Sequence, residues 1–319
     1  MKYYWTIERT LLQKGVLAAA ALLAFHLAGG LAVAKGGSNV CQETSQVTLK
    51  SCTDGAHGDY WLAIGKCDNL PTSQEQNACK RTAREDQKTS LSDCNDQFSA
   101  RQQVCAELGG GAYHPVINPA DFVGTIDNPY LPLPPGTTFI YEGQTASGTE
   151  HNEVAVTHET KDILGVPCVV VRDTVTIDGQ LVEDTTDWYA QDKYGNVWYF
   201  GENAKQYENG EIVGIAGSWT GGVDGALPGI LMQASPVVGK FYRQEFALGA
   251  AEDMADILSL NESVTVPYHS YDHCLETNEF SPLEPGTNEH KFYAPGVGYV
   301  LDIDLQTGEQ LALIDIVTE

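Results

Sequence analysis

Apolar and cysteine residues recur at helical spacing in the segment that precedes residue 109, which predicts a long helix. The positions that carry this pattern are Leu91, Cys94, Phe98, Cys105 and Leu108. A glycine run at 109–111 ends it. Thr72 and Glu75 form a capping box after Pro71, which predicts an interhelical turn just before residue 73. An earlier helix contains Gly55 and Gly58, and we expect a kink there.

From Thr137 onward the pattern changes to short runs of β-branched and aromatic residues separated by glycine turns. Strands do not alternate with helices, so we expect an antiparallel β domain, either a half-barrel or a sandwich. Ala250–Leu258 is the exception and is predicted to be helical. Gly217–Gly229 is predicted to be a lid or binding loop. The expected strands are Thr138–Glu142, Glu153–Thr157, Cys168–Thr176, Asp184–Tyr189, Val197–Phe200, Phe241–Phe246, Ser263–Pro267, His273–Glu279, Lys291–Tyr293, Tyr299–Ile303 and Gln310–Ile316.

The first six of the eight cysteines are placed symmetrically about one midpoint near residue 73. Two antiparallel helices joined by rungs of disulfides produce this arrangement, because steps of 11 and 15 residues keep the sulfurs on one helical face. The symmetry selects one pairing: Cys41 with Cys105, Cys52 with Cys94 and Cys67 with Cys79. The two cysteines left over, Cys168 and Cys274, are predicted to form a fourth disulfide.

The N-terminus has the layout of an export signal. Three basic residues flank or precede the apolar run Val16–Val33, and Ala32-Val33-Ala34 matches a cleavage site. An uncleaved membrane anchor is the alternative, which His26 and the glycine pair 29–30 disfavour. We therefore expect a secreted or periplasmic α+β protein with no membrane span after cleavage. Its predicted segments are a signal peptide (1–34), a disulfide-stapled helical hairpin (35–112), a proline-rich connector (113–136) and an antiparallel β domain (137–319).

Charge is unevenly distributed along the chain. Residues 35–115 carry eight basic and ten acidic side chains, whereas residues 116–319 carry seven basic and 32 acidic ones. Such an acidic surface excludes nucleic acid as a partner, since nucleic-acid binding requires a basic footprint. Cations or basic peptides suit it better, and an alternative is that the carboxylates simply keep an exported protein soluble.

Five stretches resemble those of a family of secreted bacterial β-rich proteins without assigned function. They are DNPYLPLPPGTTFIYEG (127–143), EDTTDWYAQDKYGNVWYFGE (183–202), GSWTGGVDGALPG (217–229), YRQEF (242–246) and EHKFYAPGVGYV (289–300). The resemblance implies an exported bacterial β domain and brings no catalytic residues with it. The run YAPGVGYV is also similar to strands of periplasmic half-barrel proteins that hold hydrophobic cargo.

Two kinds of metal site can be drawn from the sequence. His269 and His273, with Asp272 or His290, could share a transition metal in a loop or helix. On a strand, however, the two histidines would lie about 13 Å apart. Calcium is the second possibility. Its candidate ligands are Glu183, Asp184, Asp187 and Asp192 on one hairpin, with Asp302 and Asp304 on another. Alternating strand carboxylates more often form a solvated face.

Two arginines stand among apolar strand residues of the acidic domain. Arg172 and Arg243 either make structural pairs, with Asp173 or Glu245 as local partners, or receive a ligand carboxylate. Aromatic residues gather in the same region and mostly build a core. If the sheet curls, its concave side and the 217–229 loop would form an apolar ligand cup. The candidate ligand-binding residues are Arg172, Trp188, Trp198, Trp219, Asp224, Tyr242 and Arg243.

Nucleophile, zinc-protease, P-loop and dinucleotide-binding motifs are absent from the sequence, and no cofactor is required by it. The favoured hypothesis is an exported non-catalytic protein that binds a small apolar ligand or a protein partner. One alternative is an extracytoplasmic hydrolase or isomerase that uses carboxylates and Arg243. The other is a protein that captures calcium or a transition metal.

Overall fold

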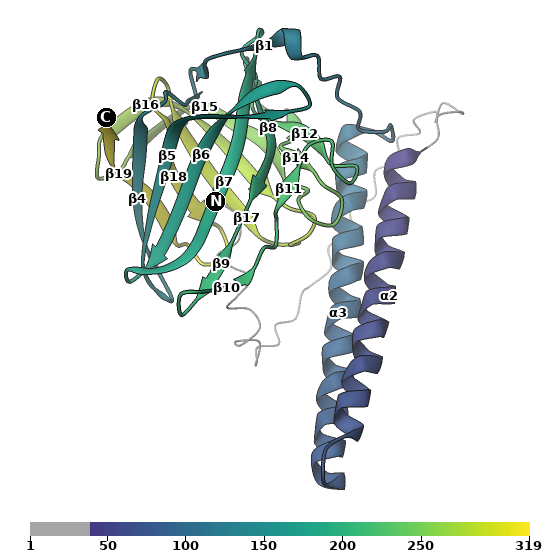
Figure 1. Cartoon of the computed structure of the whole chain (residues 1–319). Helices are drawn as coiled ribbons and strands as arrows, with labels where there is room; N and C mark the ends of the chain where they lie inside the picture. Colours follow the sequence, from purple (N-terminus) through teal and green to yellow (C-terminus); the bar gives the residue numbers. More distant parts are fainter. Residues whose placement is uncertain (1–38) are drawn as a thin grey trace, which may run out of the picture.

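The computed structural model describes residues 39–319, so the predicted signal peptide lies outside the described residues. Two long antiparallel helices come first, α2 (Val40–Asp68) and α3 (Ser73–Leu108), and a strongly curved β sheet follows (Figure 1). The predicted α+β class is confirmed. No helix in the described part of the chain has the length and apolar character needed to cross a membrane.

Three disulfides join the two helices in the nested order that the sequence symmetry predicts. Cys41 bonds to Cys105, Cys52 to Cys94 and Cys67 to Cys79, with Cα–Cα distances of 5.7, 5.7 and 5.5 Å. The hairpin has few buried residues, so these rungs supply stability that a small apolar core cannot. Disulfides of this kind are typical of proteins that fold outside the cytoplasm.

The turn between the helices is set by local chemistry. Thr72 Oγ1 accepts a hydrogen bond from Glu75 N at 3.2 Å, and Glu75 Oε2 accepts one from Thr72 N at 3.2 Å, which confirms the capping box. The expected kink at Gly55 and Gly58 is absent, since α2 continues unbroken through both. Both glycines have open space around them, and the neighbouring disulfides hold the helix in place.

The β domain is built mainly from one 17-stranded antiparallel sheet. Its first strands form a meander in which each pairs with the next. These strands are β4 (Thr137–Thr145), β5 (Gly148–Ile163), β6 (Val166–Ile177), β7 (Gln180–Asp192) and β8 (Val197–Asn203), followed by the short β9 (Gln206–Glu208), β10 (Glu211–Gly214), β11 (Trp219–Thr220), β12 (Leu227–Met232), β13 (Phe241–Arg243) and β14 (Glu245–Phe246).

A second meander completes the sheet and returns to its start. It contains β15 (Met254–Thr265), β16 (Ser270–Phe280), β17 (Asn288–Ala294), β18 (Gly298–Asp304) and β19 (Gln310–Thr318). β19 pairs with β4, while on the other side β12 pairs with β8 and β14, and β13 pairs with β15. The sheet therefore curls almost into a closed barrel rather than forming a sandwich (Figure 1).

The predicted helix at Ala250–Leu258 is wrong. Residues 254–265 form β15, which pairs with β13 and β16. Ala255 and Ile257 alternate inward there. Alanine and leucine favour helices locally, but the pairing partners on both sides stabilise the extended chain. The glycine-rich stretch 217–229 also contains β11 and the start of β12.

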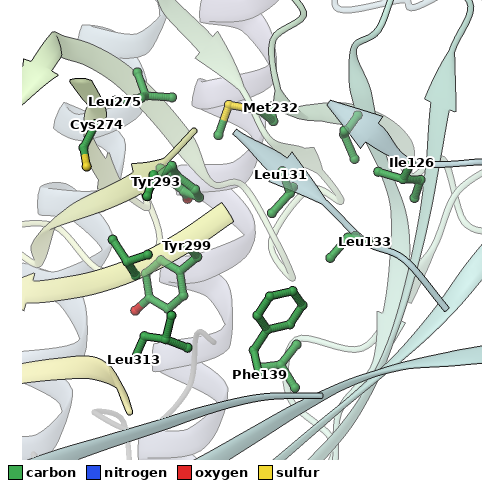
Figure 2. Packing of buried hydrophobic residues seen from close by; sticks show 14 of the residues in the cluster. Ile126, Leu131, Leu133, Phe139, Met232, Cys274, Leu275, Tyr293, Tyr299 and Leu313 are labelled. Carbon is green, nitrogen blue, oxygen red and sulfur yellow. The ribbon is translucent and has the colours of Figure 1, made fainter. Parts of the chain in front are cut away.

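The inner and outer faces of the sheet carry separate apolar clusters. On β6, Val169 and Val171 point into the barrel, and Cys168 and Val170 point outward. The segment between the hairpin and β4 crosses one end of the barrel (Figure 1). It contains the 3-10 turn η1 (Pro119–Asp121), β1 (Phe122–Val123), β2 (Asp127–Asn128) and β3 (Leu131–Pro132). Its first part covers the outer cluster, and its later residues enter the inner one (Figure 2).

The predicted disulfide between Cys168 and Cys274 is wrong. Both cysteines are free and buried. Cys168 belongs to the outer cluster and Cys274 to the inner one, so their side chains occupy different cores. The even number of cysteines gave no information about the distance between the last two. Each acts as a small apolar residue, and burial raises the pKa of the Cys168 thiol to about 12.

The hairpin docks on the barrel through α3 and the residues that follow it. Arg101 Nε and Nη2 donate to the two carboxylate oxygens of Glu252, each at 2.8 Å. Gln97 Nε2 donates to the carbonyl of Leu283 at 2.8 Å, and Tyr113 Oη donates to that of Pro228 at 2.7 Å. The other end of the hairpin projects away from the barrel (Figure 1).

Candidate functional site

The barrel interior has an aromatic level formed by inward tyrosines. Tyr189 and Tyr199 stack with ring centroids 4.8 Å apart, and Tyr299 lies 5.0 Å from Tyr141 and 5.9 Å from Tyr293. These side chains come from β4, β7, β8, β17 and β18, whose alternate residues face inward. Together with residues 131–133 they surround a cavity of about 80 Å³. Figure 2 shows Tyr293, Tyr299 and Phe139 facing Leu131 and Leu133 across the interior.

Next to the aromatic level is a polar level centred on Lys291. Its ammonium group lies 3.2 Å from Glu279, 3.0 Å from Glu289 and 4.0 Å from Asp302. Burial alone lowers the pKa of Lys291, but the three carboxylates outweigh it and hold that pKa well above its usual value. Tyr293 Oη donates to Glu279 at 2.8 Å, which joins the two levels.

Several carboxyl groups of the interior are buried. Burial raises the pKa of Asp173 and of Asp302, and repulsion from Glu289 raises that of Asp302 further. Tyr199 donates a short hydrogen bond to Asp187. Burial and the neighbouring Asp173 raise the pKa of Glu150 to about 7. The described interior therefore combines many acidic groups with one buried lysine.

The polar level also borders an open cavity of about 450 Å³. Glu279 and Lys291 line both this cavity and the small aromatic one. The outer wall is formed by loop residues around Gly217 and Ala250 and by Gln97 of α3. A small molecule could thus approach the tyrosines past the charged groups, at the side of the barrel where the hairpin docks.

The structure disperses the predicted ligand-binding aromatics. Trp188 and Trp198 face outward, where Lys161 Nζ lies 3.1 Å from the Trp188 ring centroid and Trp198 Nε1 donates to Asp192 at 2.9 Å. Trp219 is buried beside Tyr199, with ring centroids 5.5 Å apart. Tyr242 belongs to the inner cluster.

The predicted charged ligand-binding residues also lie apart. Arg172 is exposed on the outer face and paired with Asp184, at 2.8 and 3.1 Å, rather than with Asp173. Asp224 is exposed on the loop between β11 and β12. Arg243 lies between the barrel and the hairpin rather than inside the cup, so it is separated from the interior carboxylates that the enzyme hypothesis joined to it.

The three histidines proposed for a metal do not come together. His269 stacks edgewise on Tyr271, His273 contacts Asn261, and His290 pairs with Glu276 at 2.9 Å. His290 is opposite Asn278 of β16 in the sheet. Asn278 is five residues from His273, so the two positions are about 16 Å apart along that strand.

The carboxylates proposed for calcium face different directions. Asp184 binds Arg172 outside the barrel, Asp187 lies inside, and Asp192 accepts hydrogen bonds from Tyr194 N and Asn196 N in a turn. Across residues 39–319, no group of three or more His, Cys, Asp or Glu side chains is arranged to hold a metal ion.

Sequence reasoning missed the central residue of the interior, Lys291. The sequence did contain a signal for it. Lys291 and Tyr293 are two residues apart on a predicted strand, so their side chains lie on the same face. A lysine on an inward face requires acidic partners, and Glu279 lies two residues from the buried Thr277 on the neighbouring strand.

Comparisons with known proteins add little to this description. No family model and no curated protein matches the chain. One solved structure is similar, a candidate lipoprotein from Parabacteroides distasonis, at 14% identity and a TM-score of 0.33 over 60% of this chain and 99% of the other. A TM-score this low carries no argument. The resemblance to secreted bacterial β-rich proteins therefore rests on the sequence motifs alone.

Proposed function

We propose that this is a secreted or periplasmic, non-catalytic binding protein whose barrel interior takes a small ligand with an apolar body and a cationic group. One observation carries the proposal: the tyrosine-lined cavity and the open cavity beside it share Lys291 and Glu279, within a carboxylate-rich level. Tyrosine faces attract both apolar groups and cations. The disulfides support the compartment.

The polarity of the interior supports a cation in preference to an anion. Lys291 is already surrounded by three carboxylates, so it offers little to a second anion. Asp173 and Asp302 have raised pKa values because a buried negative charge is poorly solvated. An ammonium group would stabilise their ionised forms, and the apolar part of the ligand would pack against Phe139 and Leu131.

The first test uses 2-phenylethylamine as the probe. We expect the amine to raise the melting temperature of the full chain, and the Asp302→Asn variant to lose most of this increase. Asp315 is exposed on β19, so Asp315→Asn serves as the matched control. Equal stabilisation of Asp302→Asn and the control by the amine would contradict the proposal.

Amine affinity is also expected to increase as the pH is raised from acidic to alkaline values, because buried carboxyls with raised pKa values must lose a proton before they pair with a cation. Calorimetric titration across this range measures it. Native mass spectrometry of protein purified from its host would identify the natural ligand. A purified protein that carries no ligand and does not bind the amine would refute this function.

A further inference from the structure

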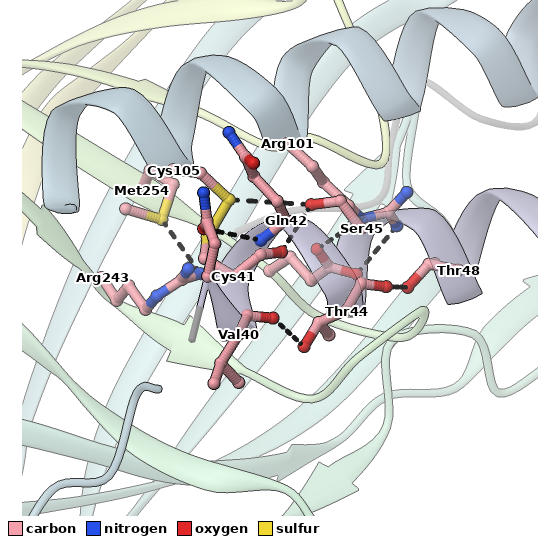
Figure 3. Close-up of a disulfide and its surroundings, with 12 residues drawn as sticks. Val40, Cys41, Gln42, Thr44, Ser45, Thr48, Arg101, Cys105, Arg243 and Met254 are labelled. Atoms are coloured by element: carbon pink, nitrogen blue, oxygen red, sulfur yellow. Dashed lines mark hydrogen bonds and ion pairs between the residues drawn. A yellow bond between two sulfur atoms is a disulfide. The ribbon is translucent and has the colours of Figure 1, made fainter. Parts of the chain in front are cut away.

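Arg243 lies between the barrel and the hairpin without a carboxylate partner among the described residues. Its Nη1 contacts the Met254 sulfur at 3.7 Å, which is a weak acceptor, and its guanidinium lies 4.9 Å from the Phe246 ring and 5.5 Å from the Tyr113 ring. The acid whose charge acts on Arg243 is Glu252, and both carboxylate oxygens of Glu252 are bound by Arg101. Figure 3 shows Arg243 and Arg101 near the Cys41–Cys105 disulfide.

A pocket of about 300 Å³ opens at this guanidinium. Barrel residues Arg243, Phe246 and Leu248 form one wall, and Tyr113 and the start of α2, at Cys41 and Thr44, form the other. The start of a 29-residue helix carries a partial positive charge, which adds to that of Arg243. The pocket lies where the disulfide-linked ends of the hairpin meet the barrel.

The chemistry of this pocket selects an anion with an apolar part. Burial lowers the pKa of Arg243, and Glu252 only partly compensates. A guanidinium is best satisfied by a carboxylate that accepts two parallel hydrogen bonds. The rings of Tyr113 and Phe246 hold its plane and offer apolar surface beside it. Asp224 and Glu252 also line the pocket, which favours a singly charged ligand over a doubly charged phosphate.

We propose that the pocket between the helical hairpin and the barrel binds a small organic monocarboxylate through Arg243. This site is distinct from the barrel interior. Tyr242 and Arg243 are neighbours on β13, so their side chains face opposite sides of the sheet, and only Tyr242 belongs to the inner cluster. The protein therefore has an anion site outside the barrel and a cation-favouring site inside it.

The test is calorimetric titration of the full, disulfide-bonded chain with 3-phenylpropionate. Wild-type protein is expected to bind it, and Arg243→Gln to lose about tenfold or more in affinity, since a charge-assisted hydrogen-bond pair is removed. Arg172→Gln is the matched control, because Arg172 is exposed and already paired with Asp184, and its affinity should equal that of wild type. The Asp302→Asn variant should also bind as wild type does, which separates this site from the interior one.

Arg243→Lys keeps the charge and removes the planar two-donor group, so we expect an affinity between those of wild type and Arg243→Gln. Residual binding by Arg243→Lys would also show that substitution at this position does not prevent folding. Circular dichroism checks that each variant is folded. Wild-type protein that binds no monocarboxylate at millimolar concentration, or an Arg243→Lys variant that binds as tightly as wild type, would overturn the proposal. Tighter binding of phenyl phosphate than of 3-phenylpropionate would overturn the preference for a monoanion.

Discussion

Individual residues in this protein are placed by charge as much as by hydrophobicity. Lys291 is buried because three carboxylates compensate for its lost hydration. Burial also raises the pKa values of several acidic groups of the interior. Glu150 on β5 is an example, with a pKa of about 7 in the folded protein.

Glu150 is expected to make the folded protein less stable as pH rises from about 4.5 to about 7. In this range the unfolded chain has lost the proton and the folded protein still holds it, so each further pH unit favours unfolding. At about 1.4 kcal/mol per unit, the free energy of unfolding should fall by about 3 kcal/mol.

Denaturant unfolding at several pH values measures this, and Glu150→Gln should remove that part of the slope. Glu153→Gln, exposed on the same strand, is the control and should keep the slope of wild type. Identical slopes for all three proteins would show that the Glu150 carboxyl ionises in the folded state as it does in the unfolded one.

The helical hairpin depends on its three disulfides for stability, and each disulfide has different neighbours. The Cys41–Cys105 disulfide lines the pocket between the hairpin and the barrel, whereas Cys67–Cys79 lies near the free end of the hairpin, beside the turn. Their effects on stability and on docking should therefore be separable.

Replacing either pair with serine should lower the stability of the hairpin by about 3 kcal/mol, because the unfolded chain gains freedom. Only the Cys41→Ser/Cys105→Ser variant should also increase hydrogen exchange in the last turns of α3. The Cys67→Ser/Cys79→Ser variant is its matched control. Equal hydrogen exchange near Arg101 in both variants would show that the Cys41–Cys105 disulfide has no special role in docking.

Elements that follow from local pattern could be predicted from the sequence, and those that depend on closure of the sheet could not. The three rungs and the capping box at Thr72 are local or symmetric features, and both are confirmed. The residues of β15 favour a helix on their own and become a strand through pairing with β13 and β16. Lys291 was not recognised, and Arg243 was expected inside the cup rather than outside it, because the faces of their strands are set by the whole barrel.

At the scale of the whole molecule, one buried ion pair connects the two parts of the fold. Arg101 on α3 and Glu252 beside β15 are both almost completely buried, and their two hydrogen bonds are short. Breaking one partner would leave the other charge buried and unpaired, which is far more costly than losing a surface pair.

Arg101→Met alone is expected to lower the free energy of unfolding by about 3–5 kcal/mol. The double variant Arg101→Met/Glu252→Met should be less destabilised than that single variant, since no unpaired charge remains. The Arg172–Asp184 pair is the exposed comparison, and its loss should cost about 1 kcal/mol or less. Chemical denaturation of wild type, Arg101→Met, Glu252→Met and the double variant checks the cycle, and additive effects for Arg101 and Glu252 would contradict it.

The continuous helix α3 sets a fixed reach for the molecule. Gln97 binds the barrel loop at Leu283, and the helix begins at Ser73, so about 36 Å of rigid rod separates that anchor from the interhelical turn at 69–72. Three disulfides join this helix to α2 along its length. A partner that binds the interhelical turn would therefore be held at a constant distance from the barrel interior and from the pocket at Arg243.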